Sequence, residues 1–521
     1  MGRYAPELVD AGFAVEVADA PLLHDGLNLA DVAHVLELRE QGLVPEPAVR
    51  RLAGVLVEAR CTPPEEFGYD PEYGESYNCR ERRFVAAIGD DTGWLHAGRT
   101  RREAVRIALR IRLRHDVCDL LDAATAFTAR AATLAEEHAE TYLVDQTYLQ
   151  HAHPSTFGHY LLSFVDPVQR EVERLFAELD WVNRSPGGVG SVNGGRLPYD
   201  RERVASMLGF DGIIEHTRDA MWQADGLLAL VGTATSLVTT LAKLAEDLEI
   251  WSSAEFDHVE LADEHTRSSV LMPQKRNPYA LTMVRGEAGV LIGRLAGMFA
   301  VAKSPSARSD NLIFAYGEVP RALELATKAT RLMAGVVAGL RVNRERMAAA
   351  LATGYSQATD LADFVMQECG VDYRTAYQVV GVTVRKAAAE GIPGAELTGE
   401  MLDAAAVELR GTPLGLAGRD LSDVLDPVAI VATRTTQGGA APAVVREMAR
   451  ARAEAAAASA ERVRQRRAAF ADAEEDLWAT ARAASVGAAQ QHDGVPGEGQ
   501  RTRESSSLDR KPGRRRRPSV R

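Results

Sequence analysis

Apolar side chains recur at spacings of three and four residues along most of this chain. One such stripe is carried by Leu109, Leu113, Val117, Leu120, Leu121 and Ala124. Similar stripes run through residues 156–182, 220–250, 279–303 and 318–340. This spacing places the apolar residues on one face of a helix, and alternation with a period of two is scarce. The pattern therefore predicts an all-α protein built around long helices.

Clusters of proline and glycine interrupt the helical pattern near residues 62–74, 185–198 and 304–310. The first two precede segments with candidate chemistry, which is typical of loops that carry function on a rigid frame. We predict three helical domains with a long central bundle and two C-terminal additions. They are an N-terminal domain over 1–104, the bundle over 105–357, a C-terminal domain over 358–442, an exposed helical extension over 443–486 and a disordered basic tail over 487–521.

The longest uncharged run covers residues 226–242 and contains several glycine, serine and threonine residues. It is short and polar for a membrane span, so we expect a helix buried on all sides within a bundle. The N-terminus shows no charged segment followed by an apolar one, and we expect no secretory signal and no membrane partner.

Composition supports a large folded protein, because 46% of the 521 residues are hydrophobic. The net charge is −13, although residues 490–521 hold nine Lys/Arg against four Asp/Glu. The rest of the chain is therefore strongly acidic, which argues against nucleic acid as a partner. The four cysteines lie far apart without a CxxC pair, and we interpret them as reduced thiols of a cytoplasmic protein.

The loop over residues 268–278 carries the strongest chemical signal, and it reads Ser-Ser-Val-Leu-Met-Pro-Gln-Lys-Arg-Asn-Pro. The hydroxyl of Ser269, the ammonium of Lys275 and the carboxamide of Asn277 lie within nine residues. Such groups can deprotonate a carbon acid and hold the oxyanion that results. An apolar helix is expected to follow from Leu281.

This loop closely resembles the signature loop of the fumarase/aspartase superfamily, and its exact residue sequence favours the argininosuccinate and adenylosuccinate lyase branches. The resemblance implies an anti β-elimination in which a succinyl adduct loses its substituent and becomes fumarate. It further implies that Ser269 is the base, that Lys275 neutralises the aci-carboxylate, and that Asn277 binds a carboxylate oxygen. Lys275 and backbone N–H groups of the loop would stabilise the serine oxyanion once the loop closes.

Three more segments are similar to argininosuccinate lyase in order and spacing. The resemblance as a whole covers about residues 75–435. Residues 95–103 read Leu-His-Ala-Gly-Arg-Thr-Arg-Arg-Glu, residues 147–154 read Thr-Tyr-Leu-Gln-His-Ala-His-Pro, and residues 185–201 form a glycine-rich loop that ends in Tyr-Asp-Arg. The resemblance implies a substrate-binding set beside Asn277. Its members are Thr147, Gln150, His151, Arg99, Thr100, Arg102 and Tyr77.

Several positions depart from the family pattern. A family histidine that helps the leaving group or binds a carboxylate is Tyr148 here. The glutamate that pairs with this histidine is Thr282, thirteen residues after Ser269. The loss of both the histidine and the glutamate is self-consistent, because a buried glutamate without the histidine as its charge partner would cost free energy. A second family histidine corresponds to Tyr77, and Arg102 stands where the family has an amide.

Three interpretations follow. In the first, the enzyme eliminates fumarate from another N-substituted aspartate, with Tyr148 as a proton donor, in specialised metabolism. In the second, it is a genuine argininosuccinate lyase. In the third, it has lost catalysis and serves as a binding or assembly subunit. The intact loop with Ser269, Lys275 and Asn277 favours the first over the loss of catalysis. His151 and His153 are the alternative candidates for the missing acid. This pair lacks a third metal ligand, and we expect neither metal nor organic cofactor.

The resemblance also implies a homotetramer whose bundle combines helices of four subunits, with each active site drawing on three of them. The partners we expect are a small dicarboxylate substrate and copies of this chain. The uncharged stretch 226–242 fits such a bundle, since we expect that one subunit alone hardly covers it.

Overall fold

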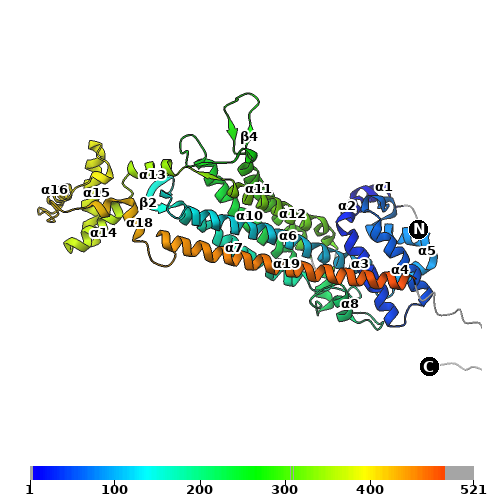
Figure 1. The fold of residues 1–521 in the computed structure, drawn as a ribbon. Coiled ribbons are helices and arrows are strands. Elements are labelled where there is room, and N and C mark those ends of the chain that lie inside the picture. The colour runs from blue at the N-terminus through cyan, green and yellow to red at the C-terminus, as the bar shows by residue number, and fades with distance from the viewer. Residues whose placement is uncertain (1–3, 305–306, 309, 487–521) are drawn as a thin grey trace, which may run out of the picture.

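The computed structural model describes residues 4–304, 307–308 and 310–486. The described chain is elongated, with a long helix bundle in the middle and a helical region at either end (Figure 1). The all-α prediction is confirmed. The tail predicted over 487–521 lies outside the described residues.

The bundle is centred on α6 (Arg101–Glu137), which packs against α7, α12 and α19. Its core consists of side chains such as Leu113, Leu120 and Phe127, none of which is exposed to solvent. The helices predicted from the apolar stripes are present with bounds close to those expected. They are α7 (Phe157–Val182), α10 (Asp225–Trp251), α11 (Tyr279–Ala302) and α12 (Ala315–Ala338).

Side-chain oxygens fix where several helices begin. The hydroxyl of Thr100 accepts the N–H of Glu103 at the start of α6, and that of Thr156 accepts the N–H of His159 at the start of α7. Each satisfies one of the N–H groups that lack a partner in the first helical turn.

The N-terminal region packs short helices around α3 (Ala20–Glu40) and α4 (Glu46–Cys61). Its other elements are α1 (Pro6–Leu8), η1 (Val9–Phe13), α2 (Ala14–Ala18), η2 (Pro64–Glu66), η3 (Pro71–Tyr73), α5 (Ser76–Ile88) and η4 (Gly89–His96). Two short helices, α8 (Arg201–Met207) and α9 (Thr217–Trp222), follow the glycine-rich loop.

The region at the opposite end has a separate hydrophobic core that includes Leu361, Val379 and Leu402. Its helices are α14 (Ala358–Cys369), α15 (Tyr373–Glu390), η7 (Gly394–Glu396), α16 (Gly399–Arg410), α17 (Ser422–Leu425) and α18 (Pro427–Ala432). The preceding helix, α13 (Arg344–Ala352), packs against β1 (Tyr142–Thr147) and contributes Met347 to the core of the bundle. The short helices η5 (Asp263–His265) and η6 (Asn311–Phe314) belong to the connections of the bundle.

Helix α19 (Pro442–Val486) returns along the whole bundle, which corrects the expectation of an exposed extension (Figure 1). Six of its ten buried side chains recur every seven residues, and they are Ala449, Ala456, Val463, Phe470, Leu477 and Ala484. This repeat forms a narrow seam that lies against α6 and α4. Three of the six are alanine, so the seam is inconspicuous in an alanine-rich sequence.

The described residues contain three antiparallel pairs of strands. They are β1 (Tyr142–Thr147) with β2 (Gln150–Thr156), β3 (Val259–Glu260) with β6 (Arg341–Val342), and β4 (Arg267–Ser268) with β5 (Arg276–Asn277). The first and third pairs are hairpins that carry predicted site residues.

A single chain already covers most of the uncharged stretch 226–242, contrary to the expectation from the sequence. Only Ala229 and Ser236 in it are exposed, because α7, α11 and α12 surround α10. By length and composition α10 could cross a membrane, yet 56% of its most apolar window is buried inside the protein, as in a core helix.

The apolar surface left uncovered lies on α11 instead. Val290, Ile292 and Phe299 are 50%, 53% and 56% exposed. Four glycines of the same helix have open space where a side chain would project, and they are Gly286, Gly289, Gly293 and Gly297. An apolar helix face with such small residues is suited to close packing against another helix.

Candidate active site

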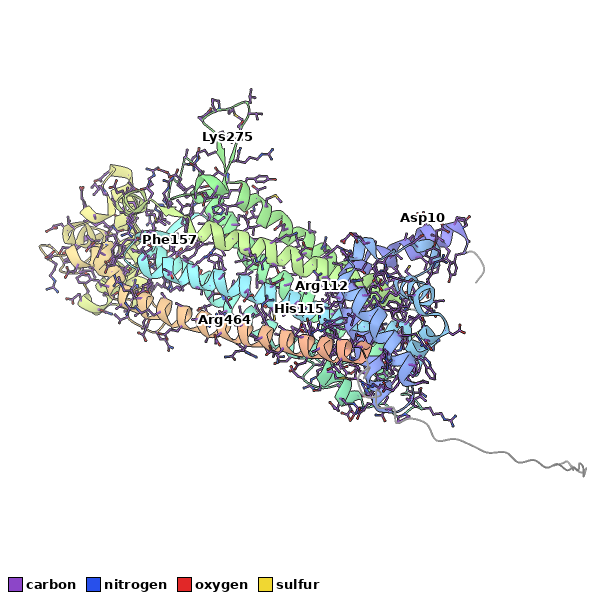
Figure 2. All side chains as sticks on the ribbon, turned by 45° about the vertical axis from the view of Figure 1, so that its right-hand side comes forward. Asp10, Arg112, His115, Phe157, Lys275 and Arg464 are labelled. Carbon is purple, nitrogen blue, oxygen red and sulfur yellow. The ribbon has the colours of Figure 1, made fainter. Side chains whose placement is uncertain are left out.

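The signature loop forms a hairpin that projects from the side of the bundle (Figure 1). Arg267 pairs with Asn277, and Ser268 pairs with Arg276. Lys275 lies on this projection, away from the packed body of the chain (Figure 2). Val270 at the tip is fully exposed, so the loop has no covering surface in one chain.

The tip of the hairpin directs two backbone N–H groups at Ser269. Its Oγ accepts hydrogen bonds from the N–H of Leu271 at 3.3 Å and of Met272 at 3.0 Å. Donors in this arrangement favour a negatively charged oxygen over a neutral hydroxyl. This is the arrangement that a serine needs if it is to act as a base.

Lys275 and Asn277 stand on the descending arm of the hairpin. The N–H of Lys275 donates to the carbonyl of Met272 at 3.0 Å, which closes the turn, and its ammonium has no carboxylate partner among the described residues. The amide nitrogen of Asn277 donates to the carbonyl of Arg267 at 2.9 Å and holds the base of the hairpin together. Both residues border a cavity of about 640 Å³ whose wall also includes Ser252, Glu249 and Thr266.

Arg276 ties the hairpin to the bundle, a role that the sequence did not reveal. It donates to the carboxylates of Glu260 and Asp263 and, at 3.0 Å, to the carbonyl of Leu261. Glu260 is held in turn by Arg341 at 2.8 Å. The orientation of the signature loop therefore depends on a cation inside the motif itself.

The predicted proton donor, Tyr148, lies at the tip of the β1–β2 hairpin. Tyr148 and Leu149 form its two-residue turn with φ values of 55° and 58°. Such turns ordinarily use Asn or Gly, because side chains disfavour positive φ. The phenol of Tyr148 is 98% exposed, so the strained turn presents it to solvent rather than to its own chain.

The strand register separates the predicted residues of this hairpin into two groups. Thr147 is paired with Gln150, whereas Gln146 is paired with His151. Since successive side chains of a strand point to opposite faces, His151 lies on the face away from Thr147 and Gln150. His151 borders a different cavity, together with His258 and Arg346.

Arg99 and Tyr77 lie inside the N-terminal region and bond to one carboxylate. Arg99 donates to Asp31 at 2.5 Å and to the Tyr77 hydroxyl at 2.6 Å, while that hydroxyl donates to Asp31 at 2.8 Å. Burial raises the pKa of Tyr77 well above its usual value, so its proton stays in place. Both side chains therefore hold the segment before α6 in place through buried contacts inside the N-terminal region.

Arg102 does not provide the free cation that its place in the sequence indicates. It pairs with Glu16 at 2.5 Å, Glu75 at 3.0 Å and Asp310 at 3.1 Å. These three carboxylates balance its charge, and two of them come from segments far away in the sequence. Thr100, its neighbour, caps α6 through its hydroxyl.

One chain does not bring the three predicted segments together. Thr100 lies at the N-terminal end of α6, and the β1–β2 hairpin follows its C-terminal end. A helix of 37 residues is about 55 Å long, so these two segments lie far apart in one chain. The signature hairpin emerges from the side of the bundle, away from the N-terminal region (Figure 1). Thr282, the partner expected for position 148, is exposed on α11.

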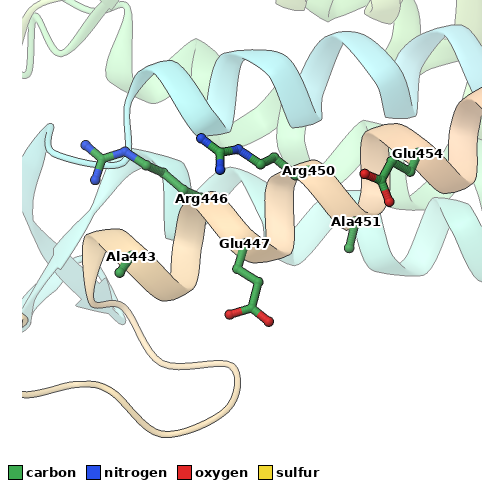
Figure 3. Close-up of a pocket in the computed structure, with 6 residues that line it drawn as sticks. All are labelled: Ala443, Arg446, Glu447, Arg450, Ala451 and Glu454. Carbon is green, nitrogen blue, oxygen red and sulfur yellow. The ribbon is translucent and has the colours of Figure 1, made fainter.

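A third depression, of about 480 Å³, lies along the start of α19 (Figure 3). Its lining residues are Ala443, Arg446, Glu447, Arg450, Ala451 and Glu454. Arg446 pairs with Glu140 and Arg450 with Glu136, both at 2.7 Å, so its cations are already compensated. None of the residues predicted from the sequence lines it, and the candidate site remains at the two hairpins.

Comparison with known proteins defines the class. Residues 72–293 match the lyase family model, and residues 355–432 match that of the argininosuccinate lyase C-terminal region. The argininosuccinate lyase of Methanococcoides burtonii is 32% identical over 419 residues, which are 80% of this chain and 84% of that protein. That of Methanothermobacter thermautotrophicus is 31% identical over 421 residues, which are 80% and 89% of the two chains.

Solved structures agree. EDDS lyase in complex with formate superposes with a TM-score of 0.81 at 26% identity, over 93% of this chain and 97% of that one. Class II fumarase from Schistosoma mansoni, at 16% identity and a TM-score of 0.65 over 78% and 90% of the chains, shares the fold. The chain belongs to the fumarase/aspartase superfamily, close to argininosuccinate lyase. It is a carbon–nitrogen lyase of the fumarate-releasing kind.

Proposed function

We propose that this protein eliminates fumarate from an N-substituted aspartate other than argininosuccinate, in specialised metabolism. The observation that carries the chemistry is Ser269 Oγ, on which two backbone N–H groups converge, with Lys275 on the same hairpin. The serine removes the Cβ proton, and the ammonium of Lys275 balances the charge that develops on the neighbouring carboxylate. Asn277 binds a carboxylate oxygen of the substrate.

The change of substrate is supported by the position that delivers a proton to the leaving group. A phenol is a weaker acid than an imidazolium, so it donates a proton less readily at neutral pH. Tyr148 therefore suits a leaving group that departs without a strong acid. The likeness to EDDS lyase, an enzyme named for another substrate, agrees with a shift away from argininosuccinate.

We further propose that the enzyme is a cytoplasmic homotetramer with active sites shared between subunits. The strained, exposed turn of Tyr148, the projecting signature hairpin and the uncovered face of α11 support this assembly. Thr147, Gln150 and Tyr148 of one copy would meet Ser269, Lys275 and Asn277 of another, and the segment at Thr100 would come from a third.

Turnover tests the substrate. The purified protein is incubated with argininosuccinate and with a panel of N-alkyl and N-aryl aspartates, and fumarate is followed by its absorbance. We expect fumarate from at least one adduct of the panel and little from argininosuccinate. Rapid turnover of argininosuccinate would show instead an ordinary argininosuccinate lyase, the second candidate, which the sequence relatives favour. Absence of fumarate from every adduct would contradict the proposal.

Mixing two impaired variants tests the shared site. Ser269→Ala and Tyr148→Phe are unfolded together in equal amounts and refolded, so that their subunits combine at random. If the two side chains come from different copies, about a quarter of the sites receive both wild-type residues and recover activity. If both belong to one chain, no site in the mixture is complete and activity stays at the level of the separate variants.

A further inference from the structure

The cavity on the His151 face of the β1–β2 hairpin is separate from the candidate active site. It measures about 260 Å³ and lies between this hairpin, α13 and the turn that follows α10. Its polar lining includes Gln146, His151, His258, Arg346 and Thr353. The proposed elimination uses no side chain of this cavity except His151, which faces away from Thr147 and Gln150.

Arg346 brings a positive charge without a carboxylate to balance it. Its Nε donates to the carbonyl of Phe256 at 3.1 Å and its Nη2 to that of Glu255 at 3.2 Å. These two bonds fix the plane of the guanidinium and leave the remaining N–H groups for another acceptor. Among the described residues Arg346 forms no ion pair, whereas Arg344 on the same helix lies 4.0 Å from Glu137.

His258 adds a buried polar atom that lacks a partner. The residue is only 6% exposed, and its ring lies edge-on to Trp251 and Phe256. Its Nδ1 has no hydrogen-bond partner in the part of the chain that the structure describes. This nitrogen is closed off from solvent, so a ligand in the cavity can reach the imidazole only on its Nε2 side.

We propose that this cavity binds a small carboxylate anion. The guanidinium of Arg346 offers its free N–H groups to the carboxylate oxygens, and His151 and His258 donate ring N–H groups from the other walls. The volume suits a short mono- or dicarboxylate better than a large ligand. Glu255 is the acidic side chain that lines the cavity. Glu255 and Arg346 are both exposed, so water screens both charges, and the two histidines must add to the selectivity for an anion.

Such a ligand would act on the hairpin that presents Tyr148. It would connect His151 on β2 to Arg346 on α13 and so restrict the hairpin relative to the bundle. Burial and the charge of Arg346 lower the pKa of His258, His151 lowers it further, and Asp257 raises it. A bound anion offsets the positive neighbours and favours the protonated ring, so binding becomes tighter as pH falls.

Calorimetric titration of the full chain with succinate tests the site without any turnover. All proteins carry Lys275→Ala and Asn277→Ala, which remove the carboxylate contacts of the proposed active site. We expect one succinate per chain in this background, binding several-fold tighter at pH 6 than at pH 8. Arg346→Gln should weaken binding by about 10- to 100-fold, because a charge-assisted pair is lost.

Two variants make the result specific. Arg344→Gln, on the same helix but outside the cavity, should bind as the background does. His151→Ala, at an exposed position where the fold tolerates truncation, should weaken binding several-fold. Absence of succinate binding in the background, or equal binding by Arg346→Gln, would overturn the proposal. Because no catalysis is measured, this failure is distinct from a failure of the proposed lyase activity.

Discussion

The Oγ of Ser269 lies 3.0 Å from the backbone nitrogen of Met272 and accepts its hydrogen bond. The contact is formed within the hairpin, before any substrate or partner subunit is present. A serine base needs its oxyanion stabilised, and here the turn supplies part of that stabilisation through its own backbone. The ammonium of Lys275 can add the rest only when the loop is covered and water is excluded.

Replacing Ser269 by alanine removes the proposed base. We expect kcat for the true substrate to fall by about a thousandfold or more, since no other group of the hairpin can take the proton. Ser268→Ala is the matched control, because that residue is the exposed neighbour in β4 and should keep activity near wild type. Equal activity of the two variants in a fumarate assay would exclude Ser269 as the base.

Tyr148→Phe removes one hydroxyl and leaves the hairpin turn in place. We expect kcat to fall by about 10- to 100-fold, with a smaller change in KM, if the phenol donates the proton to the leaving group. A wild-type rate would assign the acid to another group.

Arg276→Ala breaks the connection between the signature hairpin and residues 260–263. Because these ion pairs are exposed, the free energy of unfolding should hardly change. The rate should nevertheless fall by about tenfold, since the catalytic loop is less well oriented. Arg341→Ala removes the other partner of Glu260 and should leave turnover nearly unchanged; a similar loss in both variants would contradict a specific role of Arg276.

A charge on the uncovered face of α11 should prevent assembly. Ile292→Glu places a carboxylate among Val290 and Phe299, where the proposed interface is apolar, and light scattering after gel filtration should then report a smaller species. Val407→Glu is the control, because Val407 is 46% exposed on α16, far from that face. If Ile292→Glu keeps the mass of the wild-type protein, α11 is not the contact.

The buried His34 should make stability depend on pH. Burial holds the pKa of this imidazole well below its usual value, so the unfolded chain takes up the proton first as pH falls. The free energy of unfolding should therefore decrease below about pH 6.5, by up to about 1.4 kcal/mol per pH unit from this group. Denaturant unfolding of His34→Gln between pH 7.5 and 5 should show a shallower decrease, and an identical slope would exclude His34 as a source.

The bundle was predictable because its helices carry their burial pattern locally. The stripe that begins at Leu109 is visible in the sequence and is buried in the structure. The seam of α19 was missed, since alanine at positions such as 449 and 456 gives little hydrophobic contrast. The β1–β2 hairpin was missed as well, because its turn uses Tyr148 and Leu149 in place of the usual turn residues.

The candidate site was predictable only where its residues are neighbours in the chain. Ser269, Lys275 and Asn277 share one hairpin, as their spacing indicates. The partners of Arg102 and Arg99 could not be predicted, because Glu16, Asp310 and Asp31 approach them from distant segments. Long-range pairing of this kind depends on how the helices pack, and the local pattern of residues along the sequence does not show that packing.

A crystal structure of the assembled protein with fumarate bound is the most direct measurement. We predict that Ser269 Oγ and Lys275 Nζ of one copy contact the fumarate carbons and a carboxylate, with Tyr148 of another copy on the same molecule. Fumarate bound beyond contact distance of Ser269 and Lys275 would contradict the assignment of the base and of the whole site.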